Sequence, residues 1–196
     1  ISGGVGNRVQ IWKEGYDPST FFVYRQVYNN EGIPIEGAYV DVNGDNAITE
    51  ADRQAYKKGS PDYFMGFTNN ISYKNFDLSF TFRGNFGNYV YNNVASNQAN
   101  YQRGADSFVP NNMLTSVLET NFYRPQYFSD YYVEDASFLR MDNMSLGYAL
   151  RPFSEKLKLR VYGTVQNAFL VTNYSGLDPE ATISGIDNNI YPRSRT

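Results

Sequence analysis

The chain has 196 residues, a net charge of −3 at neutral pH and 17% aromatic residues, with 18 tyrosines and 14 phenylalanines. It contains neither cysteine nor histidine, which excludes disulfides, thiolate chemistry and the usual histidine bases and zinc ligands. A pI of about 5.0 and the lack of a basic cluster argue against nucleic acid as a partner.

The N-terminal third combines two predicted strands with a long insertion. Strands are predicted at 8–14 and 20–28, joined by a turn that contains Gly15 and Pro18. Residues 29–62 form the insertion, with one short helix expected at about 49–58. No run of 18 apolar residues exists in the chain, so no transmembrane helix is predicted.

The insertion contains a twelve-residue segment, D-V-N-G-D-N-A-I-T-E-A-D, that matches the spacing of calcium-binding loops. The ligand positions of that pattern fall on Asp41, Asn43, Asp45, the Ala47 carbonyl, Thr49 and Asp52. Two residues depart from it, because Asn46 replaces the usual glycine and Asp52 replaces the usual bidentate glutamate. We expect one Ca²⁺ here, and the alternative is a solvated turn without an ion.

The segment 63–87 predicts a membrane-spanning β-hairpin. Successive side chains of a strand point to opposite faces. After the turn Lys74-Asn75, one face carries the apolar residues Phe76, Leu78, Phe80 and Phe82. The other face carries Asp77, Ser79, Thr81 and Arg83. Strands of about 9–11 residues with this alternation are typical of transmembrane barrels, so the apolar set is predicted to face lipid.

The C-terminal half continues the pattern of long strands. Residues 88–136 are rich in asparagine and tyrosine and show little periodicity. Strands are predicted at 138–150 and 157–167, and the polar face of the second carries Lys158 and Arg160. Residues 169–196 are expected to be loop.

The connections alternate between short and long, as an outer-membrane barrel requires. We therefore predict an all-β fold, an antiparallel transmembrane β-barrel portion of about six strands. Six strands cannot close a large barrel, and open sheet edges are forbidden in lipid, so more polypeptide or another chain is expected to supply strands. The alternative is a soluble β-sandwich, whose strands also alternate.

The order of several short motifs resembles the SusC/RagA type of TonB-dependent outer-membrane transporters. The matching residues are Asp41-Val-Asn-Gly-Asp45, Gly59-Ser-Pro61, Ser72-Tyr-Lys-Asn-Phe-Asp-Leu-Ser-Phe80, Ala136-Ser-Phe-Leu-Arg-Met-Asp-Asn-Met-Ser-Leu-Gly-Tyr148, Leu159-Arg-Val-Tyr162, Val165-Gln-Asn-Ala-Phe169, Tyr174-Ser-Gly-Leu-Asp-Pro-Glu180 and Ile190-Tyr-Pro192. The motifs are weak individually and specific in this order, and they extend over nearly the whole chain.

The resemblance implies a barrel of about 22 strands with a plugged lumen, of which 1–196 would be the C-terminal part. It implies 29–62 and 88–136 as extracellular loops, with the plug domain and the final strand outside this chain. It also implies import of oligosaccharides or peptides through the outer membrane of a Gram-negative, Bacteroidetes-like bacterium. The implied partners are a SusD-like surface lipoprotein, which delivers the substrate, the TonB complex, which supplies energy, and membrane lipid.

Asp77, Arg83, Lys158 and Arg160 are predicted to face the lumen. They would contact the plug or passing solute, or they would form a salt-bridged barrel wall, which is the favoured alternative. The loop aromatics Tyr101, Phe108, Tyr123, Tyr127, Phe128, Tyr131 and Tyr132 would stack on substrate or simply pack in the loops. No catalytic motif is found, so an enzyme is not expected. The alternative function is a soluble, calcium-stabilised β-domain that binds glycans.

Overall fold

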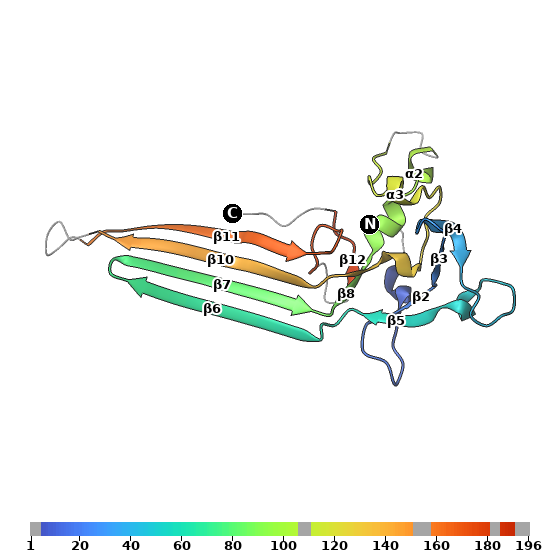
Figure 1. The fold of residues 1–196 in the computed structure, drawn as a ribbon, viewed down its shortest axis with the longest axis horizontal. Coiled ribbons are helices and arrows are strands. Elements are labelled where there is room, and N and C mark those ends of the chain that lie inside the picture. The colour runs from blue at the N-terminus through green and yellow to red at the C-terminus, as the bar shows by residue number, and fades with distance from the viewer. Residues whose placement is uncertain (1–4, 106–110, 151–157, 181–184, 191–196) are drawn as a thin grey trace. The chain divides into compact units, whose positions relative to one another are not determined.

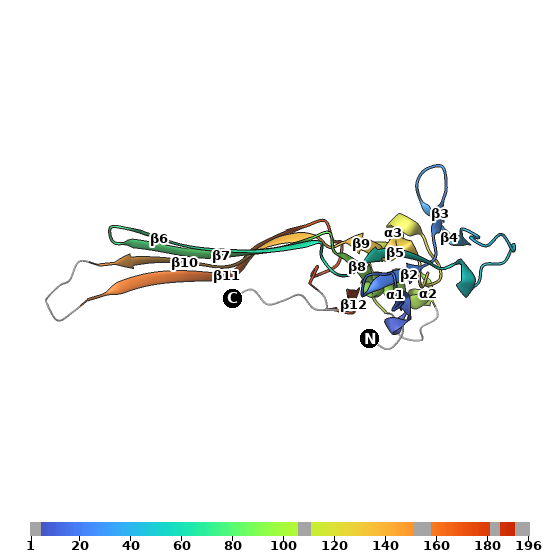
Figure 2. The same cartoon turned by 90° about the horizontal axis from the view of Figure 1, so that it is seen from below.

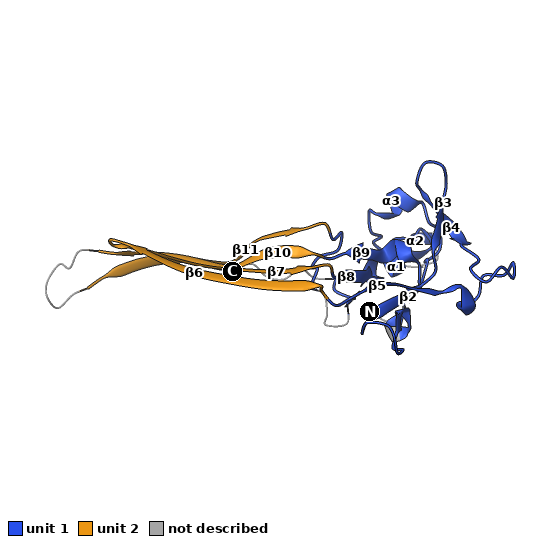
Figure 3. Cartoon of the chain, turned by 60° about the horizontal axis from the view of Figure 1, so that its bottom comes forward, with its two compact units in different colours: residues 1–60, 88–136, 174–192 blue, residues 61–87, 137–173, 193–196 orange. Residues whose placement is uncertain are grey.

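The computed structural model describes residues 5–105, 111–150, 158–180 and 185–190. The chain divides into two compact units, which Figure 3 distinguishes by colour. Unit 1 consists of residues 1–60, 88–136 and 174–192, and unit 2 consists of residues 61–87, 137–173 and 193–196. Among the described residues, no helix combines the length and the apolar character needed to cross a membrane.

Unit 2 is one four-stranded antiparallel sheet. Its strands are β6 (Tyr63–Tyr73), β7 (Phe76–Phe86), β10 (Phe138–Ala149) and β11 (Arg160–Thr172), in the order β11-β10-β7-β6. Figures 1 and 2 show these strands as long neighbouring ribbons. Strands in globular proteins usually have 3–10 residues, and each of these has at least 11.

The hairpin predicted at 63–87 is confirmed. β6 and β7 pair without a register shift from Tyr63↔Phe86 to Tyr73↔Phe76. The connection is the two-residue turn Lys74-Asn75, in which Lys74 adopts a left-handed conformation with φ of 54°. The short turn fixes the register, and the register fixes which side chains share a face.

Asp142 is an extra residue in β10 relative to β7. The ladder passes from Met141↔Phe82 directly to Asn143↔Thr81. In a regular strand, Met141 and Met144 would point to opposite faces, because they are three residues apart and side chains alternate. The bulge at Asp142 therefore keeps both methionines on the face that carries Phe80 and Phe82.

Unit 1 is built from many short elements. Its strands are β1 (Gln10–Ile11), β2 (Thr20–Val23), β3 (Gln26–Tyr28), β4 (Pro34–Tyr39), β5 (Gln54–Lys58), β8 (Tyr89–Asn92), β9 (Val133–Asp135) and β12 (Ile186–Asp187). Its helices are α1 (Asn93–Gln98), α2 (Gln102–Ala105) and α3 (Val117–Thr120), with 3₁₀ turns η1 (Gly6–Val9), η2 (Glu50–Asp52) and η3 (Asp130–Tyr132). The strands form three small sheets, β1-β2-β5, β3-β4 and β12-β8-β9.

A hydrophobic core joins these elements. Phe21, Tyr91 and Phe122 are at most 1% exposed, and they cluster with residues such as Val23 and Ile186. The buried Tyr91 hydroxyl accepts a hydrogen bond of 3.0 Å from the Phe128 amide, so its polar end is satisfied. Unit 1 thus buries apolar side chains in the manner of a small soluble domain.

The helix predicted at 49–58 is wrong. The chain there forms the 3₁₀ turn η2 and then strand β5, which pairs with β2. Arg53 separates the two in an extended conformation, with φ of −72° and ψ of 141°. The pairing with β2 decides the structure, because local helix propensity is a weak preference that tertiary contacts override.

The predicted N-terminal strands are also shorter than expected. The first becomes η1 followed by the two residues of β1, and the second breaks into β2 and β3. At the break, the Tyr24 amide donates to the Phe128 carbonyl at 2.7 Å, and the Tyr24 carbonyl accepts from the Asp130 amide at 2.9 Å. The antiparallel, all-β class is confirmed, with four of the six predicted strands in the long sheet of unit 2 and the other two in unit 1.

The regions expected to be loop contain more structure than their composition suggests. Residues 88–136 hold β8, β9 and the three short helices, and 169–196 hold the end of β11 and the strand β12. β12 runs parallel to β8, and the Tyr91 amide donates to the Gly185 carbonyl at 2.8 Å. Leu157, the first residue of the strand predicted at 157–167, and the predicted loop aromatic Phe108 lie outside the described residues.

Candidate functional site

The two faces of the unit 2 sheet differ in chemistry. Residues opposite each other in the register share a face, so the ladder assigns every side chain. One face, called the apolar face below, carries Met65, Phe67, Ile71, Tyr73, Phe76, Leu78, Phe80, Phe82, Leu139, Met141, Met144, Leu146, Tyr148, Val161, Val165, Phe169 and Val171. The predicted set Phe76, Leu78, Phe80 and Phe82 therefore lies on one continuous hydrophobic surface.

Within unit 2, this apolar face is open. Phe67, Phe76 and Val161 are 48%, 52% and 59% exposed, and the buried hydrophobic clusters of the described chain consist of unit 1 residues. Phe80 is half-buried because it packs on its neighbours in the same sheet, with ring centroids 6.1 Å from Phe67 and 5.6 Å from Phe82. An exposed apolar surface of this extent marks an interaction with membrane or protein.

Aromatic residues mark both ends of the apolar face. At the end with the short turn, Tyr73, Phe76 and Tyr148 occupy one row of the ladder, and the rings of Phe76 and Tyr148 are 4.6 Å apart. At the opposite end, Tyr63 pairs with Phe86. Tyrosine at the borders of an apolar band is typical of membrane–water interfaces.

The opposite, polar face of the sheet carries an ion pair that spans three strands. Asp77 on β7 accepts a hydrogen bond from Arg160 Nε on β11 at 2.9 Å, and the Arg160 NH2 group donates to its second carboxylate oxygen. Gly147 of β10 lies between the two, and a Cβ there would be 2.6 Å from Asp77 Oδ2. A side chain at this position would displace the ion pair, which passes directly over it.

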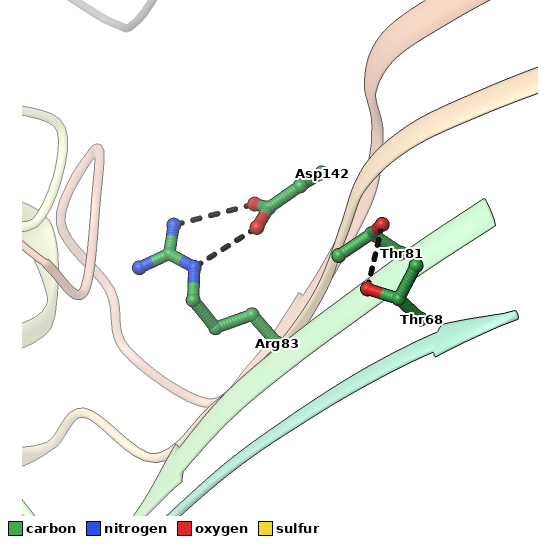
Figure 4. A network of polar contacts seen from close by, with 4 residues as sticks. All are labelled: Thr68, Thr81, Arg83 and Asp142. Carbon is green, nitrogen blue, oxygen red and sulfur yellow. Dashed lines mark hydrogen bonds and ion pairs between the residues drawn. The ribbon is translucent and has the colours of Figure 1, made fainter.

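A second ion pair and two hydroxyl pairs lie on the same face. Arg83 Nε and NH2 donate to the two carboxylate oxygens of Asp142 at 3.0 and 3.2 Å, and Thr68 lies 3.1 Å from Thr81 between hydroxyl oxygens (Figure 4). The hydroxyls of Thr164 and Ser145 form a similar pair on β11 and β10. The bulge that preserves the apolar face thus also supplies the carboxylate that binds Arg83.

Three of the four residues predicted to face a lumen share this polar face. They are Asp77, Arg83 and Arg160, whereas Lys158 is exposed and precedes β11. Their mutual and neighbouring ion pairs agree with the favoured alternative, a salt-bridged wall. Whether this face borders a lumen stays a prediction. The sequence analysis assigned no role to Gly147 and Asp142, because their partners Asp77, Arg160 and Arg83 lie far away in the sequence.

The Asp41–Asp52 segment folds as a hydrogen-bonded loop. Asp41 accepts hydrogen bonds from the amides of Gly44 at 2.7 Å and Asn46 at 2.8 Å. Asn46 has a φ of 61°, the left-handed conformation expected at the sixth position of a calcium loop. Asp45 accepts from the Ala47 amide at 2.8 Å and, like Asp41, has a solvent-accessible side chain.

Asp52, the predicted twelfth-position ligand, has a structural role. It is fully buried and accepts hydrogen bonds from the amides of Thr49 at 2.7 Å and Val42 at 2.9 Å, which close the loop and cap η2. These hydrogen bonds, led by that from Thr49, lower the pKa of Asp52. The described part of the chain contains no group of three acidic or histidine side chains placed to hold a metal, and calcium binding stays a prediction.

Unit 1 contains a cavity of about 660 Å³. Its walls come from α1, α3, η3, β9 and the segments 175–177 and 187–190. Tyr131 and Tyr132 line it, which the sequence analysis had grouped with the loop aromatics. Tyr132 is 3% exposed and belongs to the core, so packing explains it better than exposed stacking on a substrate. The cavity itself was missed, since its walls come from segments far apart in the sequence.

Comparisons with known proteins place the chain among TonB-dependent receptors, although no family model matches it. It is 42% identical to TonB-dependent receptor SusC of Bacteroides thetaiotaomicron, covering 100% of this chain and 20% of that protein. It is 32% identical to TonB-dependent receptor P3 of Formosa agariphila, covering 96% of this chain and 22% of that protein. The chain thus spans about a fifth of the length of these curated relatives.

Solved structures give the same result for the fold. The RagAB peptide importer in its closed-closed state matches 97% of this chain and 23% of that chain, with a TM-score of 0.74 and 25% identity. Its open-open state matches 97% of this chain and 23% of that chain, with a TM-score of 0.69 and 24% identity.

Proposed function

Because the chain belongs to the SusC/RagA type of TonB-dependent transporters, we propose that it forms the C-terminal part of an outer-membrane barrel that imports nutrients. The barrel would lie in the outer membrane of a Gram-negative bacterium of the Bacteroidetes kind. Its relatives are named as receptors and importers, which agrees with the expectation that the protein is not an enzyme.

The open apolar face of unit 2 is the observation that carries this proposal. A soluble sandwich would cover Phe76, Leu78, Phe80 and Phe82 with a second sheet, at a separation of about 10 Å. In lipid the same side chains need no second layer, and the aromatic rows at both ends would lie at the membrane surfaces. The alternative of a soluble glycan-binding domain requires a cover for this face that the described residues of unit 2 do not supply.

The polar face of unit 2 would line the lumen, where water or a plug domain solvates it. Asp77 and Arg160 neutralise each other there, as do Arg83 and Asp142. In the interior of a barrel such pairs hold neighbouring strands together without exposing charge to lipid. The lumen residues would thus support the wall, and substrate selection would depend on other parts of the protein.

The transporter would work with a SusD-like surface lipoprotein and with the TonB complex. Support for a partner comes from the similarity to the RagAB peptide importer. Support for energy coupling comes from the TonB-dependent receptors among the relatives. The substrate would be an oligosaccharide or a peptide.

We further propose that the Asp41–Asp52 loop takes one Ca²⁺, which would stabilise the loop and take no part in chemistry. The left-handed Asn46 and the accessible carboxylates of Asp41 and Asp45 support it. Asn43, Thr49 and the Ala47 carbonyl would complete the site, and Asp52 would keep its capping role. Calorimetry should show calcium-dependent heat in the full-length protein that the double variant Asp41→Asn, Asp45→Asn loses. An absence of heat in the unaltered protein would refute the proposal.

Extraction of the native protein from its source membrane tests the transport proposal. We expect a polypeptide several times larger than 22.4 kDa that requires detergent and co-purifies with a surface lipoprotein. A species of 22.4 kDa that stays monodisperse without detergent would overturn the proposal. Loss of nutrient uptake on deletion of the gene would then identify the substrate class.

A further inference from the structure

The cavity of unit 1 has the size of a small-molecule site. Its volume of about 660 Å³ lies within the range of about 300–1,000 Å³ that is usual for ligand pockets. Apolar residues of α1 such as Val94 and Ala95 form part of the wall, and polar groups converge from other elements. A cavity of mixed lining and this volume accommodates a solute of several non-hydrogen atoms.

The cavity is strongly acidic. Its lining contains Glu119, Glu134 and Asp187 and neither lysine nor arginine. Neutral groups satisfy two of these carboxylates. Glu134 accepts from Asn92 Nδ2 at 3.0 Å and the Ser175 amide at 2.9 Å, and Asp187 accepts from the Tyr174 hydroxyl at 2.7 Å.

The negative charge of the cavity is not compensated in the described part of unit 1. The ion pairs there join Arg53 to Glu50 and Lys58 to Asp17, and none involves a carboxylate of the cavity. The Glu119 side chain is exposed and lines the cavity. Its carboxylate oxygens accept no hydrogen bond from a described residue. An anionic solute would be repelled, whereas a cation would gain from each carboxylate.

Tyr132 gives an independent indication of a ligand. Only 3% of Tyr132 is exposed, and its side chain lines the cavity. Its ring packs edge-on against Tyr91 and Tyr131, but its hydroxyl forms no hydrogen bond with any described residue. The hydroxyl is in contact with the solvent of the cavity, so it is available to form a hydrogen bond with a bound solute.

We propose that this cavity binds the primary ammonium group of a small solute, with Glu119 and Glu134 as counter-charges and the Tyr132 hydroxyl as a hydrogen-bond partner. The proposal deepens the proposed import function and rests on it for its biological role. An ammonium group has three donors and no acceptor, which complements a wall rich in carboxylate oxygens. Amino sugars and peptide N-termini both carry this group.

Calorimetry on the full-length transporter in detergent tests the proposal with paired probes. The probes are glucosamine and triglycine, each compared with its N-acetylated form, which lacks the charge and carries one additional acetyl group. We expect one of the amines to bind at least about tenfold more tightly than its acetylated form, a difference that equals about 1.4 kcal/mol. The amine that binds identifies the source as an amino sugar or a peptide.

Matched variants assign the binding to this cavity. Glu119→Gln should weaken amine binding about tenfold, since it removes an exposed carboxylate without removing a hydrogen bond of the fold. Glu31→Gln, at an exposed acidic residue outside the cavity lining, should leave binding unchanged. Tyr132→Phe should weaken binding several-fold while the amide protection of unit 1 stays intact, because the hydroxyl makes no bond within the described fold.

Several results would overturn the proposal. Equal binding of the acetylated forms, no binding of either amine, or equal effects of Glu119→Gln and Glu31→Gln would each refute it. A lysine from the rest of the polypeptide that fills the cavity in a structure of the whole transporter would also refute it. If the protein imports solute but binds no amine, only this inference is refuted. If the protein is absent from the outer membrane, the proposed function is refuted.

Discussion

Units 1 and 2 are both rich in β-strands, yet unit 1 buries its apolar side chains and unit 2 exposes many of them. Unit 1 encloses Phe21, Tyr91 and Phe122 in a core that excludes solvent. Unit 2 spreads most of its phenylalanines over one side of a sheet, where residues such as Phe67 and Phe76 are about half exposed. The difference is the one expected if unit 1 is surrounded by water and the apolar face of unit 2 contacts an apolar environment.

The core of unit 1 should respond most strongly to truncation. Phe21→Ala removes a ring that is 0% exposed, so the local free energy of unfolding should fall by about 3–5 kcal/mol. Hydrogen exchange of unit 1 amides in the full-length protein measures the loss. Phe21→Leu is the control and should cost less than about 1.5 kcal/mol. Similar losses for the two variants would contradict the packing described for this core.

A charged substitution should have a different effect on stability on each of the two faces of unit 2. Phe80→Arg places a charge in the middle of the apolar face and should destabilise the folded protein in lipid by about 2–4 kcal/mol. Ser79→Arg, one residue away on the polar face, should cost well under about 1 kcal/mol. Urea unfolding in liposomes measures both free energies. If the two variants were equally harmful, contact of this face with lipid would be disproved.

The ion pair over Gly147 should be sensitive to a single methyl group. Gly147→Ala should destabilise unit 2 by about 1–3 kcal/mol, because the new Cβ would overlap the Asp77 carboxylate. Gly163→Ala in β11 is the matched control, since a Cβ there meets nothing within 4 Å, and it should be neutral or slightly stabilising. Adding Asp77→Ala to Gly147→Ala should recover part of the loss in the same unfolding measurement. A harmless Gly147→Ala would contradict the placement of the ion pair.

The smallest effects should be those of pH on unit 1. Burial, the largest cause, raises the pKa of Asp130 above its ordinary value of 3.8. The folded state therefore binds a proton more readily than the unfolded state, so this group favours folding below pH 3.8 and loses that contribution as the pH rises through its folded pKa. Asp130→Asn should flatten this part of the stability curve, measured by hydrogen exchange at several pH values.

Asp52 should act with the opposite sign. Its pKa is lowered, so its contribution to stability is present above pH 3.8 and is lost as the pH falls through the folded pKa. Asp52→Asn should weaken protection of the 41–52 loop at neutral pH and remove the acid-dependent loss. If Asp52→Asn lost protection at low pH as the unaltered protein does, the capping hydrogen bonds from Thr49 and Val42 would contribute nothing to the pH dependence.

The long hairpin could be predicted in detail because its determinants are local. Alternation from Phe76 to Arg83 assigns both faces, and the two-residue turn at Lys74 fixes the register. The motif-based resemblance to SusC/RagA transporters is confirmed for the same reason, since these strings are contiguous in sequence. Asn46, which occupies the glycine position of the Asp41–Asp52 pattern, has the positive φ that this position requires.

The errors occurred where distant segments meet. The helix expected at 49–58 is replaced by a strand because β2 offers it a partner. The loop aromatics could not be divided into core and surface from their spacing, since Tyr132 packs in the core against Tyr91, which lies about 40 residues away in the sequence. Asp142 could not be assigned to Arg83 without the bulge that aligns them.

The sequence by itself determined the long strands of unit 2, the two faces of their sheet and the family. Alternation and contiguous motifs are properties of neighbouring residues. Only the tertiary structure decided the compact core of unit 1, the acidic cavity beside Tyr132 and the ion pair that passes over Gly147. These features arise when segments far apart in the chain come within contact distance. Side-chain packing and charge pairing act over a few ångströms in space, whatever the separation in sequence.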